Sequence, residues 1–586
     1  MLRSSDSGRS AEPLILALIG FALIVAGMQD LYAMIPVGRT GVLSFTLPIV
    51  SCQYGVLLCL IGMASYAMGF AGKSIGRELW SQCGATKARL IAFAHLDSRA
   101  FPIGVSSIVL CVAVATTIGA GLRLWYSDQP MRYDEAFAFN TFIRDEKYSV
   151  FYYPLPNNHV LYSLLEYLSW KALGASPLAL RMPALLFGIG LIPLVFGVCR
   201  KLGQGRSTGI AACGTAVFPF LVSYSTNGRG YSLLAFTVTL LIYLALDANG
   251  RATKIRAIPL ALVAAAGMLV MPSMLYALGG FTLWLSCLIY AETRSWKDVL
   301  LDVLLPFATF TAALTLLFYL PVALVSGGLQ AVTSNRFVVP LPAAQFIQAI
   351  PPHIVRVLSD FCRCLGSPLA ILIAALAIAG LLDRRQRAPH TNLLLCMAAG
   401  SFLVFMLKRS IPFERTWIYF IPIVLIIAET GFASLNDRWL RLSPRVIVAC
   451  MAIVSTAYAI WLANSDAVEK FPDTGTAPYA EAVADDLAPR ISNSSEVCAE
   501  LPADAPINYY LWLRLKSSGE TRPLASSRAF FIRSISSSTP AAWDDQELQQ
   551  IGVFGDLLVY DGRDSNWLAD KPGWTCWHPA LFSSRQ

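Results

Sequence analysis

Charged residues are scarce in this sequence. Of its 586 residues, 14% are Asp, Glu, Lys or Arg and 56% are hydrophobic, whereas an ordinary soluble protein carries about 25% charged residues. Apolar runs of the roughly 20 residues that cross the hydrocarbon core of a bilayer recur from Pro13 to Ala463. The composition therefore excludes a soluble globular protein and predicts an α-helical membrane protein that crosses the bilayer many times.

About thirteen apolar runs qualify as membrane spans. They cover residues 13–35, 43–70, 102–125, 182–200, 208–226, 230–247, 257–271, 273–291, 299–325, 367–383, 391–407, 416–434 and 445–463. Two of these runs are short and are joined by Met271-Pro272-Ser273, so a single broken helix is the alternative there. The count therefore depends on how the chain turns at Pro272.

Short loops rich in Lys and Arg mark the cytoplasmic side of a membrane protein. With thirteen spans, four such loops fall on one side, at residues 73–99, 200–206, 251–256 and 384–387. This predicts a multi-pass protein of the cytoplasmic membrane, with a cytoplasmic N terminus and an extracytoplasmic chain after Ala463. No small-residue cleavage site follows the first apolar run, so a retained first span is expected rather than a signal peptide.

Residues that bind transition metals are few outside the spans. The sequence has 13 cysteines and 5 histidines, and most cysteines lie in apolar runs, where they act as small buried hydrophobic residues. Cys498 and Cys576 lie outside the runs and suit a disulfide in an oxidising compartment, with two separate thiols as the alternative. Cys362 and Cys364 have no nearby partners that complete a zinc site. No metal ligand is therefore assigned, and the need for a divalent cation stays open.

The chain divides into three parts. Residues 1–100 form a two-span appendage that ends in a cytoplasmic segment, and residues 101–463 form a transmembrane core with outer loops at 126–182 and 326–367. Residues 464–586 alternate helix-like and strand-like patterns, which are typical of a small soluble α/β domain. That domain has a net charge of −7, from 10 basic and 17 acidic residues, within an overall charge of +8. Since membrane topology accounts for most of the positive charge, nucleic acid is not an expected partner.

Four polar groups interrupt the apolar pattern on the outer side. They are Asp134-Glu135, Asn157-Asn158-His159, Asn227-Gly228-Arg229-Gly230-Tyr231, and the stretch from Lys408-Arg409 to Glu414-Arg415. A carboxylate can accept a proton from a hydroxyl nucleophile, and guanidinium or ammonium groups can neutralise a departing phosphate. Together at the surface of a bilayer, these groups predict transfer from a phosphate-linked lipid.

These motifs resemble those of the GT-C superfamily, integral membrane glycosyltransferases that use polyprenyl-phosphate sugars. Its relatives include the protein O-mannosyltransferases and the transferase that adds aminoarabinose to lipid A. The resemblance covers about residues 101–435. It rests on the segments Tyr133–Ala136, Pro156–Leu165, Arg181–Gly188, Tyr224–Leu234 and Pro412–Arg415, with Tyr419 and Pro422. It implies a GT-C-like core whose shared module is seven spans long, from Phe101 to about Val325.

The resemblance also implies roles for single residues. Asp134 would be the general base of an inverting transfer, and Glu135 would support the conformation of its loop. Arg229, in an Arg-x-Tyr element with Tyr231, would contact the donor phosphate. The alternatives are a solvated turn for the two carboxylates and a snorkelling interfacial side chain for Arg229.

Three more residues are assigned to donor or acceptor binding, namely His159, Asn158 and Arg415. His159 could instead pack or cap a loop helix, and Arg415 could pair with Glu414. Asn227 stands where many relatives carry Gln or Glu, which removes a carboxylate that could take part in metal binding there.

The expected function is that of a GT-C type, inverting glycosyltransferase that moves a hexose or pentose from a polyprenyl-phosphate donor to a glycan or lipid acceptor outside the cytoplasmic membrane. Donor, acceptor and membrane lipids are its expected partners. One alternative is a flippase or transporter for lipid-linked sugars, which would place ionisable residues near the bilayer midplane. Another is a glycan polymerase or ligase. Sparse charge within the spans disfavours the transporter, and the early carboxylate pair disfavours the polymerase.

The thirteen-span count predicts that the C terminus lies outside the cytoplasm. A reporter enzyme that is active only in the cytoplasm should therefore be inactive when it is fused after Gln586. A fusion at Arg387, in a predicted cytoplasmic loop, is the positive control. Activity of the Gln586 fusion would show that the count is off by one, most simply at Pro272.

Overall fold

The structure is a computed structural model. It describes residues 103–144, 150–202, 208–246, 254–328, 330–333, 338–363, 365–383, 390–465, 467–468, 475–491, 495–518, 528–535, 548–562 and 574–577. These residues form two compact units. Unit 1 comprises the described residues up to Gly119 with Ile189–Phe218 and Leu233–Ala457, and unit 2 comprises Ala120–Gly188, Pro219–Ser232 and the residues from Tyr458 onward. The spans expected at 13–35 and 43–70 lie outside the described residues.

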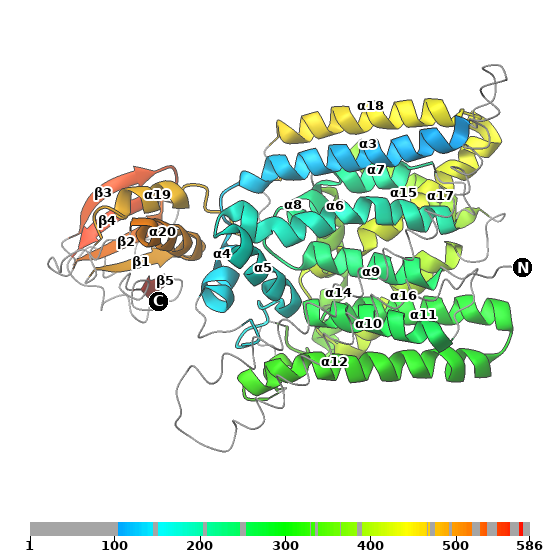
Figure 1. The fold of residues 1–586 in the computed structure, drawn as a ribbon, viewed down its shortest axis with the longest axis horizontal. Helices are drawn as coiled ribbons and strands as arrows, with labels where there is room; N and C mark the ends of the chain where they lie inside the picture. The colour runs from blue at the N-terminus through cyan, green and yellow to red at the C-terminus, as the bar shows by residue number, and fades with distance from the viewer. Residues whose placement is uncertain are drawn as a thin grey trace, which may run out of the picture. The chain divides into compact units, whose positions relative to one another are not determined.

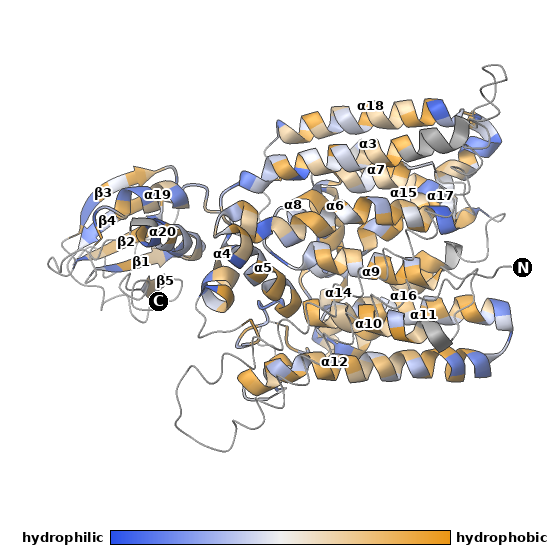
Figure 2. Ribbon diagram, viewed as in Figure 1, coloured by the Kyte–Doolittle hydropathy of each residue, from blue (hydrophilic) through white to orange (hydrophobic). Residues whose placement is uncertain are grey.

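Helices occupy all the remaining positions where a span is expected (Figure 1). They are α3 (Ile103–Trp125), α6 (Pro177–Leu202), α7 (Ile210–Val217) with α8 (Pro219–Ser225), α9 (Tyr231–Ala245), α10 (Lys254–Val270), α11 (Met274–Thr293), the π-helix η3 (Asp298–Leu304) with α12 (Leu305–Val325), α15 (Ser367–Leu382), α16 (His390–Lys408), α17 (Phe420–Leu435) and α18 (Pro444–Ala463). Hydrophobic residues dominate these helices, and hydrophilic residues gather at the ends of several, such as α11, α12 and α18 (Figure 2).

Six helical segments of the described chain are long and apolar enough to cross a membrane, and four shorter helices are also apolar. The mostly helical membrane fold is therefore confirmed, while the count of thirteen spans stays a prediction. At the uncertain position, α10 and α11 are separate helices joined by a turn at Met271–Ser273, and they pack on different partners, α12 and α16. The run at 208–226 is broken into α7 and α8, because Pro219 has no N–H to continue a helix.

Glycines let the helices of unit 1 approach closely. α15 packs on α17 where Gly380 meets Gly431, and α11 packs on α16 where Gly279 and Gly280 meet Gly400. A Cβ atom at Gly431 would lie 2.7 Å from the backbone nitrogen of Gly380 and would collide with a carbonyl of α15. Small residues at such contacts are the usual basis of helix packing in a membrane, where lipid gives no hydrophobic driving force between helices.

One buried carboxylate holds two helices of unit 1 together. Glu429 of α17 accepts hydrogen bonds from the backbone N–H groups of Thr208 (2.7 Å), Gly209 (3.2 Å) and Ala211 (2.8 Å), at the start of α7. The first N–H groups of a helix have no partner within the helix, and a negative charge is stabilised there. Glu429, the ionisable side chain of α17, therefore caps α7.

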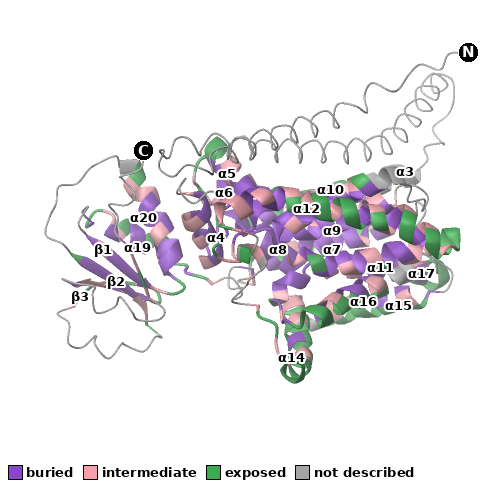
Figure 3. Ribbon diagram, turned by 90° about the horizontal axis from the view of Figure 1, so that it is seen from below, coloured by how far each residue is buried: buried purple, intermediate pink, exposed green. Residues whose placement is uncertain are grey.

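Short helices form the segment between α3 and α6. They are η1 (Tyr126–Asp128), α4 (Tyr133–Ala138), η2 (Phe139–Ile143) and α5 (Val160–Leu173), all in unit 2. In unit 1, the described parts of the second loop contain α13 (Gln330–Thr333) and α14 (Ala343–Cys362), and η5 (Glu414–Trp417) and η6 (Asn436–Leu440) flank α17. Helices α8 and α9 are almost wholly buried (Figure 3).

The C-terminal part of unit 2 contains a five-stranded sheet. Its elements are α19 (Ala480–Leu487), β1 (Glu496–Glu500), α20 (Asp504–Ser518), β2 (Ala529–Ser534), β3 (Gln549–Phe554), β4 (Leu557–Gly562) and β5 (Trp574–Trp577). The strand order is β3-β4-β2-β1-β5, with β1 and β2 parallel and the other pairs antiparallel. The expected disulfide is present, and Cys498 of β1 is bonded to Cys576 of β5. This small α/β fold agrees with the pattern of the sequence.

Close packing of α15 on α17 predicts that unit 1 tolerates no side chain at Gly431. The change Gly431→Ala should destabilise the protein by about 1–3 kcal/mol, the usual cost of overpacking, and so lower its melting temperature in detergent. Gly121→Ala is the matched control, because a Cβ atom there meets nothing within 4 Å. Equal melting temperatures for the two variants would contradict the close packing.

Candidate active site

Glu135 collects four hydrogen bonds in unit 2. Its Oε2 accepts from Arg181 Nε (3.0 Å) and from the N–H of Gly228 (2.6 Å), while its Oε1 accepts from the N–H of Arg132 (2.8 Å) and from Arg181 Nη2. The side chains of Glu135 and Arg181 are fully buried. A carboxylate has about four lone-pair sites, so N–H donors occupy all of them. Glu135 is therefore placed to hold its surroundings together and has no site left for a cation.

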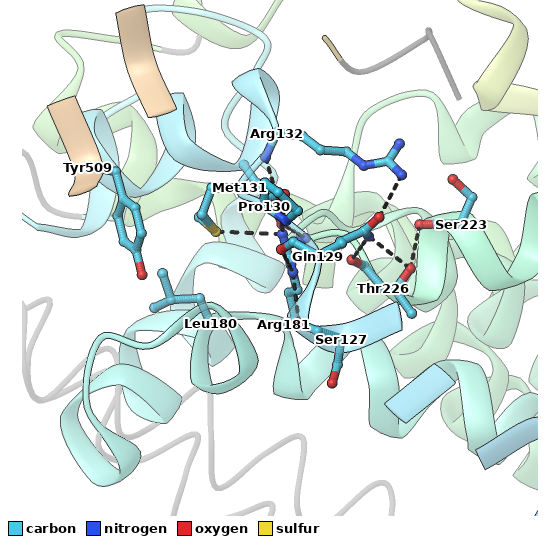
Figure 4. Close-up of polar contacts among 12 residues, drawn as sticks. Ser127, Gln129, Pro130, Met131, Arg132, Leu180, Arg181, Ser223, Thr226 and Tyr509 are labelled. Carbon is cyan, nitrogen blue, oxygen red and sulfur yellow. Dashed lines mark hydrogen bonds and ion pairs between the residues drawn. The ribbon is translucent and has the colours of Figure 1, made fainter. Parts of the chain in front are cut away.

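Arg181, near the start of α6, holds the loop that precedes α4. Its guanidinium donates to the carbonyls of Ser127 (2.8 Å), Gln129 (2.6 Å) and Pro130 (3.0 Å), as Figure 4 shows. Arginine can reach several acceptors at once because its five N–H groups lie in a rigid fork. The backbone leading to Asp134 is thereby fixed by one side chain from another helix.

The turn between α8 and α9 closes on this loop. A Cβ atom at Gly228 would lie 3.1 Å from Glu135 Oε2 and 3.2 Å from Glu135 Cβ, so glycine leaves room for the carboxylate to reach the backbone N–H. Gln129 Nε2 donates to the carbonyl of Thr226 (2.8 Å), and Gln129 Oε1 accepts from Arg132 Nη2 (2.9 Å). Turn and loop are therefore joined by loop side chains that bond backbone groups of the turn.

Arg229 lies next along this turn and is 2% exposed. Its Nη1 donates to the carbonyl of Asn157 (2.7 Å) and approaches that of Asp134 (3.4 Å), and its Nη2 donates to Asn157 Oδ1 (2.8 Å). Asp134 itself lies in the first turn of α4 and is 8% exposed. The structure thus brings Asp134 and Arg229 together, and every bond just given for Arg229 runs to an uncharged acceptor.

His159 and Tyr231 lie beside Arg229. His159 Nδ1 accepts from the N–H of Gly230 (3.0 Å), and its Nε2 is 3.4 Å from Arg229 Nη2. The ring of Tyr231 packs edge-on against His159, with centroids 5.1 Å apart, and against Tyr224 at 4.9 Å. His159 therefore supports the turn between α8 and α9, and its side chain does not cap its own helix, α5.

Asn158 has a different environment from its neighbours. Its Nδ2 donates to the carbonyls of Val150 (2.8 Å) and Tyr152 (2.9 Å), and its Oδ1 accepts from the Ser163 hydroxyl (2.8 Å). The side chain is fully buried. These bonds show that Asn158 holds the loop together. The sequence predicts a role in substrate binding and not this structural role.

Arg415 belongs to unit 1, in η5, and is described by itself. It is buried, with its guanidinium 4.6 Å from the ring centroid of Phe413. Its neighbour Glu414 pairs with Arg356, at 2.9 Å, and lies 3.7 Å from His353 Nδ1. The ion pair of Glu414 is therefore made with α14, whereas the alternative drawn from the sequence paired it with Arg415.

Sequence reasoning missed Glu166, which lies in α5 and is fully buried. Among the described residues, neither of its carboxyl oxygens has a hydrogen-bond partner, and the same holds for both side-chain polar atoms of Asn227. Burial raises the pKa of Glu166 well above its usual range, the charge of Glu135 raises it further, and Arg229 and Arg181 oppose the shift. The signal available in the sequence was a lone carboxylate within an apolar stretch.

The C-terminal segment also supports the carboxylate loop, which no pattern in the sequence indicated. The N–H of Tyr133 donates to the carbonyl of Gly475 (2.9 Å), and the N–H of Met131 donates to the hydroxyl of Tyr510 in α20 (3.0 Å). Asn140 Nδ2 donates to the carbonyl of Ala505 (2.9 Å). The loop that carries Asp134 is thus held from three directions, by α6, by the 226–230 turn and by the tail.

Metal-ligand residue types cluster once among the described residues, at Glu496, Cys498 and Cys576. Both cysteines are joined in the disulfide, and a metal would need them as thiolates. This cluster therefore does not fit a metal ion in the oxidised protein.

The fold of this chain is similar to that of several solved structures. ArnT from Cupriavidus metallidurans bound to undecaprenyl phosphate matches with a TM-score of 0.52 and 13% identity, over 78% of this chain and 97% of that chain. Its apo state matches with a TM-score of 0.51, the same identity and the same coverage. The apo oligosaccharyltransferase of Archaeoglobus fulgidus matches with a TM-score of 0.44 and 16% identity, over 71% of this chain and 60% of that chain. No family model and no curated protein matches the sequence.

The predicted resemblance is thus confirmed at the level of the fold, which is similar to that of ArnT. The match covers nearly all of ArnT, so it concerns the whole architecture rather than one helix bundle.

The buried ion pair between Glu135 and Arg181 predicts a large effect on stability. Arg181→Met should destabilise the protein by about 3–5 kcal/mol, because it leaves a buried carboxylate without its counter-charge. Arg490→Met is the matched control, since Arg490 pairs with Asp486 at the surface, 43% exposed, and such pairs contribute about 0–1 kcal/mol. Thermal unfolding of the purified variants in detergent measures both. Similar melting temperatures would show that the ion pair does not hold the loop.

Proposed function

We propose that the protein is an inverting glycosyltransferase that moves one sugar from a polyprenyl phosphate to a hydroxyl group of a glycan or lipid acceptor. The observation that carries this proposal is the approach of Arg229 Nη1 to the backbone carbonyl of Asp134 (3.4 Å), which brings the two residues together in unit 2. It combines a group that can take a proton with a cation that can receive a phosphate. The fold shared with ArnT, whose structure holds undecaprenyl phosphate, supports a donor of that chemical class.

In the proposed reaction, Asp134 accepts the proton of the acceptor hydroxyl as its oxygen attacks the anomeric carbon. A new carbon–oxygen bond forms on the face opposite the phosphate, and the bond from the anomeric carbon to the phosphate oxygen breaks with its electron pair. The products are a glycoside of inverted configuration and polyprenyl phosphate. Arg229 would stabilise the charge that develops on the leaving phosphate, since planar guanidinium offers paired donors to phosphate oxygens.

Glu135 supports this reaction indirectly in the proposal. Its four donors leave it no capacity to accept a proton from substrate without loss of a hydrogen bond. We assign it to positioning, together with Arg181, and assign proton transfer to Asp134. His159 and Tyr231 complete the surroundings of Arg229.

Release of polyprenyl phosphate tests the proposed function. The full-length protein, purified in detergent, is incubated with synthetic polyprenyl-phosphate sugars and a crude glycolipid extract as acceptor. Sugar-dependent release of polyprenyl phosphate is the expected result. Movement of intact donor across the bilayer of proteoliposomes without release would instead identify a flippase.

Asp134→Asn should abolish transfer while the protein still inserts and purifies normally. An amide keeps nearly the same shape but cannot take a proton, and loss of a general base typically costs about 10²–10⁴-fold in rate. Asp128→Asn is the matched control, because Asp128 is an exposed carboxylate of the same loop. Near-parental turnover of Asp134→Asn would remove Asp134 from the chemistry.

Arg229→Lys should weaken donor use although it keeps the positive charge. Lysine cannot reproduce the paired hydrogen bonds of a guanidinium, so the KM for donor should rise about tenfold, and more in Arg229→Ala. Arg490→Lys, at an exposed ion pair, is the control. If Arg229→Lys behaves as the parent across donor concentrations, Arg229 is an interfacial anchor.

A further inference from the structure

Glu166 lies close to the turn that carries Arg229. The carboxyl oxygen Oε1 of Glu166 is 3.8 Å from the position that a Cβ atom would take at Gly228, and Glu135 Oε2 is 3.1 Å from that same position. Two carboxyl groups therefore approach one glycine of the turn. The backbone N–H of that glycine donates to Glu135 and not to Glu166.

The carboxyl group of Glu166 is buried without hydrogen-bond donors from the described residues. Glu166 has no exposed surface, and neither of its oxygens accepts a hydrogen bond from any described residue. Asn227, the residue before Gly228, is also fully buried and also lacks partners for its side-chain amide among those residues. An ionised carboxylate in such a place is strongly unfavourable, because the lost hydration is not replaced by donors.

Charges nearby act in both directions on Glu166. The carboxylate of Glu135 disfavours a second negative charge, whereas Arg229 and Arg181 favour one. Burial outweighs the two arginines and raises the pKa of Glu166 well above its usual range. Arg181 is already engaged by the ion pair with Glu135, so Arg229 is the cation that an ionised Glu166 would neutralise.

We propose that Glu166 is a positioning residue of this site, a neutral carboxylic acid that supports the turn at Gly228 and leaves the charge of Arg229 for the donor phosphate. With Glu166 neutral and Asp134 ionised as the general base, the formal charges of Asp134, Glu135, Arg181 and Arg229 add to zero. With Glu166 ionised the sum would be −1, and a phosphate would meet a net negative charge. This inference rests on the proposed function, because it assigns the free charge to a donor phosphate.

The protonation of Glu166 can be observed without any enzyme assay. Infrared spectra of the full-length parent and of Glu166→Gln, both in detergent at neutral pH, are subtracted. The parent should show one carbonyl stretch of a protonated carboxyl group that the variant lacks. Loss of a carboxylate band instead would overturn the proposal, since it would show that Glu166 is ionised.

Kinetics with a synthetic polyprenyl-phosphate sugar test the role. Glu166→Gln, a neutral side chain of the same shape, should keep kcat and the KM for donor within about twofold of the parent. Glu166→Ala removes the support of the turn and should raise the KM for donor about tenfold with a smaller effect on kcat. Glu135→Gln is the comparison, and it should lose activity severely, because it removes the charge that Arg181 needs.

Two results would contradict the role of Glu166. A loss in Glu166→Gln as large as in Glu135→Gln would mean that the negative charge of Glu166 is required. An unchanged KM in Glu166→Ala would mean that the side chain supports nothing. If the parent releases no polyprenyl phosphate from any donor, the proposed function fails, while the infrared result still decides the protonation of Glu166.

Discussion

The buried ion pair between Glu135 and Arg181 is the interaction on which the candidate site depends. It joins residues 46 positions apart, and each partner also bonds the backbone of other segments, the 127–130 loop through Arg181 and the N–H of Gly228 through Glu135. A pair buried this deeply gains little net stability against an apolar pair of the same size, but loss of one partner is costly. Its effect is to fix one arrangement of Asp134 and Arg229.

Unit 1 is built under a different constraint, the absence of water. Its helices approach through glycines at 279, 280, 380, 400 and 431, and its buried Glu429 caps α7. A carboxylate with such partners has no free capacity to bind a transported solute. This disfavours the transporter that the sequence left as an alternative, since its coupling residues would need to be available near the midplane.

The sequence predicts much of the fold because each membrane helix corresponds to one continuous apolar run. The described helices fall where those runs lie, and the disulfide of Cys498 with Cys576 joins the two cysteines of the soluble tail. The bounds of short strands are harder to predict, since β5 has only four residues. Of the site, Asp134, Glu135 and Arg229 are recognisable by motif. The pairing of Arg181 with Glu135 and the approach of Glu166 to the turn depend on contacts between distant segments that no local pattern encodes.

The structure of the protein with bound polyprenyl phosphate, determined by electron cryo-microscopy, tests the central claim most directly. The account predicts that the phosphate contacts the guanidinium of Arg229, next to Asp134, with Glu135 still paired to Arg181. A phosphate held only by residues of unit 1, such as Arg415, with Arg229 still bonded to Asn157, would contradict it.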